Sequence, residues 1–378
     1  MEASHKKIDM ERVKWGGTPR PLMDLYRVLL GKDLGDSKSS LIFNETKDYE
    51  TGFSDHYEEY IKPLVNDYET RRKGVIKIIR QKVFWSIPLT ICLLTPTLLF
   101  MQTYISSLIF PLAVVFITIF ILGKFIFKPI SEFKAIIKLT VFPEIVKFYD
   151  DLEYSFLGNY NPDKLKKYKV LPDFEGFSME DHLQGSYKGI NLDLFEAKLD
   201  RRVRGIRVGN GLNSDRVLVF NGLIVVIGVN KKFYSRTIVK NKALDRPLEG
   251  KKVLLEDPEF KKKFDVSSTD QVEARYLLTP AFMERFLHLN KEYGEEAWKA
   301  LKTSLPKGGG ILPPEISCSF YEQSLLLVVA NLERNMFEVN GSLLQSRDFI
   351  DDSKNFLRQV NSIFKIIDAL KLDEKTGL

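Results

Sequence analysis

The densest group of residues suited to chemistry lies between Leu255 and Pro280, where several carboxylates stand near an arginine. Carboxylates gathered beside a cation can bind a metal ion or act as a general acid. The same acids are also suited to begin helices, because an aspartate there accepts hydrogen bonds from free N–H groups. The pattern favours helix capping and ion pairing, and it leaves a partner-binding surface and catalysis as alternatives. The candidate interaction surface consists of Asp257, Glu259, Asp270, Glu273 and Arg275.

Elsewhere the sequence lacks the common catalytic patterns. The four histidines, which form no HExxH pair, are His5, His56, His182 and His288. No GxSxG motif occurs, and the three glycines at 308–310 are not followed by the Lys-Ser/Thr pair of a phosphate-binding loop. A metal site at His182 with Asp181 is an alternative to a structural histidine. We therefore predict no catalytic residue, no metal ligand and no cofactor, and we favour a role other than an enzyme.

A second group of interest is basic. Arg201, Arg202, Arg204 and Arg207 follow one predicted strand and precede another, so they are candidate contacts for anionic lipid headgroups. Each such charge contributes on the order of 1 kcal/mol when it lies close to an anionic membrane. A solvated hairpin is the alternative. Nucleic acid is not expected as a partner, because no aromatic residues are interleaved with the arginines to stack on bases.

The element that must position these groups is an uncharged run. From Val83 to Gly123 the chain has no charged side chain over about 40 residues. One membrane-spanning helix needs about 20 apolar residues, so the run predicts a transmembrane hairpin with spans at about 83–101 and 107–127. The alternative is one buried helical core in a soluble protein. Because no charged side chain lies between Val83 and Gly123, the spans are expected to be a passive anchor, with an oligomeric pore as a weaker alternative.

The charges on both sides of this run predict its orientation. Six basic residues lie between Arg71 and Lys82, and four more lie between Lys124 and Lys138, whereas the joining turn has none. Cytoplasmic flanks retain Lys and Arg, so both termini are expected in the cytoplasm. The first 40 residues lack an apolar signal-peptide core.

Hydrophobic patterning predicts an α+β fold: the transmembrane hairpin and a cytoplasmic antiparallel sheet with helices on one face. Residues 190–199 and 216–229 are typical of strands, and Asn221-Gly222 suggests a tight turn within the second. Asp55 with Glu58 suggests a capping box at a helix start, with Pro63 as a kink or a new start, and Thr279-Pro280 begins another helix. The expected organisation is a partly irregular segment 1–56, a juxtamembrane helix 57–82, the hairpin 83–127, a cytoplasmic stalk helix 128–165 and an α+β domain 166–378.

Length and composition restrict the number of domains and the classes of protein that these predictions allow. The 378 residues allow about two or three folding units. With 44% hydrophobic and 28% charged residues and a net charge of +6, the chain is neither disordered nor collagen-like. Two cysteines, Cys92 and Cys318, are too few for a disulfide scaffold or a zinc ribbon.

Several local motifs resemble one bacterial family. They are Glu180-Asp181-His182 with Gly185, Phe220-Asn221-Gly222-Leu223 followed by Asn230-Lys231, and above all 255–260 (LEDPEF) leading to 270–280 (DQVEARYLLTP). The chain is similar to the two-span membrane family known only as domain of unknown function thirty-one thirty-seven. The resemblance implies a protein of the bacterial inner membrane with two central spans and a cytoplasmic carboxy-terminal domain, and it implies no established activity. The basic segment 201–216 departs from the family in being longer and more basic.

Together these patterns predict a membrane-anchored cytoplasmic interaction or scaffold module. Its expected partners are the lipid bilayer, a protein at the cytoplasmic face and anionic lipid. The alternative function is a membrane-bound enzyme acting on a lipid or nucleotide through the acidic block 255–280.

Overall fold

The structure, a computed structural model, describes residues 42–104, 116–117, 138–208, 211–242, 248–291, 315–330, 337 and 348–370. It divides into two compact units. The first comprises Met1–Phe148 with Val339–Asn355, and the second comprises Tyr149–Glu338 with Phe356–Leu378. The domain boundaries expected from the sequence remain predictions.

The first unit is built on a long helix. A short 3-10 turn η2 (Asp48–Glu50) precedes α2 (Phe53–His56), the π-helical turn η3 (Tyr57–Ile61) and α3 (Lys62–Tyr104), which follow one another without a break. The expected start at a capping box of Asp55 and Glu58 is wrong: the helix begins at Phe53 after Gly52, whose φ is +85°. Pro63 neither breaks nor restarts it. The wide π turn lies directly before Pro63, which has no N–H to offer the preceding turn.

The segment that follows the uncharged run returns to the start of this helix. Residues 138–146 are helical, and the His56 Nε2 atom lies 2.7 Å from the carbonyl oxygen of Glu144, to which it donates a hydrogen bond. The ring of Phe53 packs edge-on against Phe148 with centroids 5.0 Å apart. Tyr57 and Phe53 are fully buried. Two segments almost 90 residues apart therefore form one core.

The expected transmembrane hairpin is not confirmed. Among the helices of the described residues, none is both long enough and apolar enough to cross a membrane. Most of the second expected span, 107–127, lies outside the described residues.

The second unit confirms the predicted α+β class with an antiparallel sheet. Its strands are β1 (Leu152–Ser155), β2 (Gly176–Tyr187), β3 (Ile190–Val208), β4 (Gly211–Asn241), β5 (Lys251–Lys252), β6 (Phe264–Ser268) and β7 (Glu315–Ala330). The order is β1-β2-β3-β4-β6-β5, and β7 also pairs with β4. Its helices are α5 (Pro162–Lys166), α6 (Pro258–Lys263), α7 (Gln271–Leu277) and α8 (Pro280–Leu289). The helix α10 (Ile350–Leu370) begins in the first unit and belongs to the second from Phe356 onward.

The sheet is buried on both faces, which corrects the prediction of helices on one face. On one side Leu165 of α5 belongs to the core cluster that contains Ile224 and Ile238 of β4. On the other side Phe282 of α8 packs against Phe320, the cross-strand partner of Thr237, with centroids 5.5 Å apart. Because neighbouring residues of a strand point to opposite faces, α5 and α8 cover different sides.

The expected turn at Asn221-Gly222 is also wrong, because β4 runs through it as one strand from Gly211 to Asn241. Gly222 pairs with Ala197 on one side and Ala330 on the other. A β-carbon on Gly222 would lie 2.0 Å from the carbonyl oxygen of Val329. A glycine is needed at this position because β7 approaches β4 closely, and the chain does not turn here.

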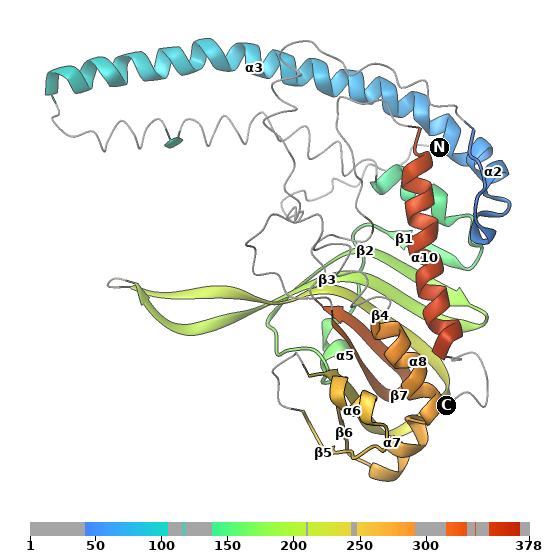
Figure 1. The fold of residues 1–378 in the computed structure, drawn as a ribbon. Coiled ribbons are helices and arrows are strands. Elements are labelled where there is room, and N and C mark those ends of the chain that lie inside the picture. The colour runs from blue at the N-terminus through green and yellow to red at the C-terminus, as the bar shows by residue number, and fades with distance from the viewer. Residues whose placement is uncertain are drawn as a thin grey trace. The chain divides into compact units, whose positions relative to one another are not determined.

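Beyond the sheet, β3 and β4 continue together as a two-stranded ribbon (Figure 1). β2 pairs with β3 only as far as Asp200, and β7 pairs with β4 only from Gly222 onward. Two described stretches, Arg201–Val208 and Gly211–Val219, therefore form a ribbon that carries the basic residues, and we call it the arginine ribbon.

Candidate functional site

Two acids of the block 255–280 cap helix N-termini, as the sequence predicts. The side chain of Asp257 accepts a hydrogen bond of 2.9 Å from the Phe260 N–H at the start of α6. Asp270 accepts bonds from the N–H groups of Val272 (2.7 Å) and Glu273 (3.1 Å) at the start of α7. Both carboxylates thus satisfy amide groups that a helix start leaves free. Glu259 lies exposed in the first turn of α6, at the positive end of the helix dipole.

Glu273 joins α7 to the central strand β4. Its carboxylate accepts hydrogen bonds from the backbone N–H groups of Tyr234 (3.0 Å) and Ser235 (2.7 Å), and from the Ser235 hydroxyl. Ser235 is buried. The carboxylate therefore satisfies backbone donors that β4 does not use in its ladder, and it fixes α7 against that strand.

The exposed side chains of α7 are apolar and basic. Val272 and Tyr276, one turn apart on α7, are 77% and 61% exposed, and Tyr234 beside Glu273 is 87% exposed. Arg275 is also exposed, and within the described part of the chain it makes no ion pair with an acid. We call Tyr234, Val272, Arg275 and Tyr276 the α7 patch. Of these four residues, only Arg275 is among those predicted from the sequence. The spacing of Val272 and Tyr276 relative to the buried Ala274 and Leu277 could have indicated the other exposed face of the helix.

The four arginines of the candidate lipid contact all lie on β3 in the arginine ribbon. Arg201 and Arg202 are exposed, and the Arg202 Nε atom lies 3.8 Å from a carboxylate oxygen of Glu175. The side chains of Arg204 and Arg207 are outside the described residues. On the facing strand Val217 and Leu218 are 44% and 58% exposed. The ribbon therefore presents apolar side chains close to the two arginines.

A buried polar cluster lies at the bulge of β2, around the motif Glu180-Asp181-His182. Asp181 is fully buried and has a left-handed φ of +55° where the β2–β3 register shifts. It accepts a hydrogen bond of 2.5 Å from the Tyr154 hydroxyl. His182 Nε2 lies 3.0 Å from Asp193 Oδ1. Burial, and then the nearby charge of Asp181, raise the pKa of Tyr154 well above its usual value, so this tyrosine stays a neutral donor.

The alternative of a metal site at His182 with Asp181 gains no support from this geometry. Within the described residues no group of three or more His, Cys, Asp or Glu side chains is arranged to hold a metal ion. Cys318 is fully buried, and this burial raises the pKa of its thiol, so the reactive thiolate form is disfavoured.

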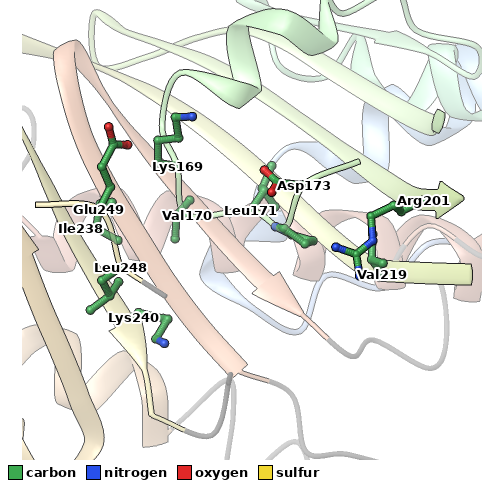
Figure 2. A pocket seen from close by; sticks show the side chains of 11 residues that line it. Lys169, Val170, Leu171, Asp173, Arg201, Val219, Ile238, Lys240, Leu248 and Glu249 are labelled. Carbon is green, nitrogen blue, oxygen red and sulfur yellow. The ribbon is translucent and has the colours of Figure 1, made fainter. Parts of the chain in front are cut away.

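One cavity of about 650 Å³ lies in the second unit, at the base of the arginine ribbon (Figure 2). Its walls come from the segment after α5, from β3 and β4, and from the residues before β5. Three basic side chains line it, Lys169, Arg201 and Lys240, together with the acids Asp173 and Glu249. The remaining wall is largely apolar. Its volume is within the range of small-molecule sites, which is about 300–1,000 Å³.

The fold and the outward surfaces define an antiparallel α+β domain that follows a long helical unit. Residues 218–372 match the family described as "Protein of unknown function (DUF3137)". This match confirms the resemblance that the sequence motifs indicate, and it includes the long motif at 255–280. The motif at 180–182 lies outside the matched range.

The other comparisons add little. No curated protein matches this chain. Among solved structures, the crystal structure of the mycobacterial trehalose monomycolate transport factor A, TtfA, is similar with 12% sequence identity and a TM-score of 0.28. That similarity covers 59% of this chain and 91% of the mycobacterial chain. At this score it carries no argument about function.

Proposed function

We propose that this protein is a membrane-anchored interaction module of the bacterial inner membrane. The uncharged run inserts as a hairpin with spans at about 83–101 and 107–127, and both termini lie in the cytoplasm. The second unit is displayed there to a protein partner. No catalytic step is part of the proposal, because the carboxylates of the acidic block are occupied by backbone N–H groups.

The return of the chain to the base of its long helix carries the proposal of a hairpin. The hydrogen bond between His56 and Glu144 and the contact between Phe53 and Phe148 join the segments before and after the run. At 1.5 Å per residue, α3 extends about 30 Å from Lys62 before the uncharged run begins. A chain that leaves one core and returns to it is the arrangement expected of two antiparallel spans with both ends on one side.

The surface of α3 changes at the same point. Up to Lys82 its exposed side chains include Arg71, Lys73 and Lys77. Beyond Val83 the exposed side chains include large apolar ones: Phe84, Trp85 and Ile91 are 68%, 64% and 61% exposed. Apolar surface in water costs roughly 25 cal/mol per Å², and this cost disappears in the acyl chains of a bilayer. The anchor thus gives these side chains a favourable environment.

The α7 patch is the proposed contact for the protein partner. An exposed apolar group rimmed by charge is typical of an interaction site. Arg275 is part of the patch, and the Lys232 ammonium lies 5.6 Å from the Tyr234 ring centroid. The adjacent acids Asp270 and Glu273 already accept hydrogen bonds from backbone N–H groups. We therefore expect a partner with an apolar contact surrounded by acidic side chains.

Topology is the first test. Reporter domains fused after residue 82, at Thr103 and at the carboxy terminus should report cytoplasm, outside and cytoplasm in that order. The positive flanks and the uncharged turn are the reason. An external carboxy terminus would overturn the anchor and the cytoplasmic display together.

The partner contact is tested in intact cells. A photo-crosslinking amino acid at Tyr276 should give a discrete crosslinked product, and Arg275→Glu should reduce it by reversing the local charge. The matched control is the same crosslinker at Leu157, which is 41% exposed in the same unit but outside the patch. Equal products at Tyr276 and Leu157 would refute the α7 patch as the contact.

A further inference from the structure

The cavity at the base of the arginine ribbon has an excess of positive charge. Its acid Glu249 is engaged by a second arginine, because Arg236 Nη1 lies 2.8 Å from the Glu249 carboxylate. Asp173 is then the acid that faces the basic residues Lys169 and Arg201. Figure 2 shows these side chains on different segments around the opening. A small anion can therefore be approached from more than one side.

The third basic residue lies deeper in the unit. Lys240 is only 7% exposed and lies on β4 opposite Asp265 of β6. In a partly desolvated site a positive charge attracts an anion more strongly than in open water.

The remaining wall of the cavity is apolar. Val170 and Leu171 come from the segment after α5, Val219 and Ile238 from β4, and Leu248 from the stretch before β5. Val170, Leu171 and Ile238 are also part of the core cluster on this face of the sheet. A ligand with an apolar portion would cover this wall and exclude water from it.

We propose that this cavity binds a small amphiphilic anion, in which one phosphate or carboxylate group is joined to a short apolar body. The anionic group lies between Lys169 and Arg201, and the apolar body lies on the wall formed by Val219, Ile238 and Leu248. The site belongs entirely to the second unit. It does not depend on the membrane anchor or on the α7 patch, so it can fail or succeed separately from them.

Calorimetric titration of the full chain in phosphatidylcholine nanodiscs tests the site, with empty nanodiscs as the blank. The probe is dihexanoyl phosphatidic acid, compared with inorganic phosphate and with dihexanoyl phosphatidylcholine. We expect saturable binding of phosphatidic acid and at least tenfold weaker binding of the other two. Equal binding of inorganic phosphate would show that the apolar wall has no part. Equal binding of phosphatidylcholine would show that the basic residues have none.

Three variants locate the binding. Arg201→Gln and Lys169→Asn should each raise the Kd for phosphatidic acid about five- to tenfold, by removing one charge-assisted hydrogen bond. Asparagine suits position 169, where φ is +58°, because it tolerates the left-handed region. The control is Arg202→Gln, which removes an exposed charge next to Arg201 but outside the cavity. An equal loss in Arg202→Gln, or no loss in the other two, would refute the cavity as the site, as would the absence of saturable binding.

Discussion

Replacing Tyr154 by phenylalanine should destabilise the second unit through Asp181. Asp181 is fully buried, and the Tyr154 hydroxyl donates to its carboxylate at 2.5 Å. Phenylalanine keeps the ring and removes only the donor. Leaving a buried acceptor without this donor costs about 1–3 kcal/mol, and more where the acceptor is charged. For a unit of this size 1 kcal/mol lowers Tm by about 2–4 °C, so we expect a fall of about 2–12 °C.

Two changes at Asp181 separate the hydrogen bond from the backbone. Asp181→Asn keeps an acceptor oxygen for Tyr154, and asparagine tolerates the φ of +55°, so its Tm should fall less than that of Tyr154→Phe. Asp181→Ala removes the acceptor and keeps a β-carbon in the left-handed region, so its loss should be the largest. The measurement is thermal unfolding of the full chain in detergent. A Tm of Tyr154→Phe within 1 °C of the unchanged protein would refute the reasoning.

The same pair predicts a pH dependence. Burial and the charge of Asp181 raise the pKa of Tyr154 in the folded state, whereas an unfolded tyrosine titrates near pH 10. The folded state therefore holds the proton more tightly, and its contribution to stability is fully present below pH 10 and is lost as pH rises beyond it. Between pH 9 and 11 the unchanged protein should lose more stability than Tyr154→Phe. Parallel pH profiles would contradict a protonated, buried Tyr154.

Two further predictions concern the sheet and the caps. Gly222→Ala should prevent cooperative unfolding or lower Tm by more than 10 °C, because its β-carbon would lie 2.0 Å from the Val329 carbonyl oxygen. Gly228→Ala is the control, since its β-carbon would meet Asn191 at an ordinary 3.4 Å; equal melting of the two variants would contradict the close approach of β7. Asp270→Ala and Asp257→Ala should each cost about 0.5–2 kcal/mol as lost helix caps, and the exposed Arg275→Ala about 0–0.5 kcal/mol. A larger loss in Arg275→Ala than in Asp270→Ala, measured by thermal unfolding, would reverse the assignment of structural and surface roles.

Helix caps could be predicted from the sequence, whereas the pairing of strands far apart in the chain could not. Asp257, Asp270 and Thr279 could be predicted as caps because a cap depends on the three or four residues that follow it. The turn predicted at Asn221-Gly222 is wrong because the Asn-Gly pair alone does not distinguish a turn from a strand. What decides its role is the backbone of Val329, more than 100 residues away, which no local pattern contains.

The candidate surface shows the same division. The sequence predicts an interaction surface in the block 255–280, but most of the predicted residues are acids, and Asp257 and Asp270 cap helices in the fold. Glu273 is occupied by Tyr234 and Ser235, a contact across 38 and 39 residues. Only the assembled sheet and helices show that Val272 and Tyr276 are the large apolar residues of this block left exposed. The cavity has the same origin, because its walls come from segments that only the sheet brings together.

The positions of the acids along α3, as well as the number of lysines and arginines, support the proposed orientation. The acids of this helix lie early and are paired: Asp67 with Arg71 at 2.8 Å, and Glu69 with Arg72 at 2.6 Å. After Glu69 no acidic residue occurs before Glu132. The last two turns before the uncharged run therefore contain Lys77, Arg80 and Lys82 and no acidic residue, and the segment after the run is positive as far as Glu132. Positive charge at both ends of a hairpin, with none at its turn, resists translocation of either end, so the two ends are retained on the same side.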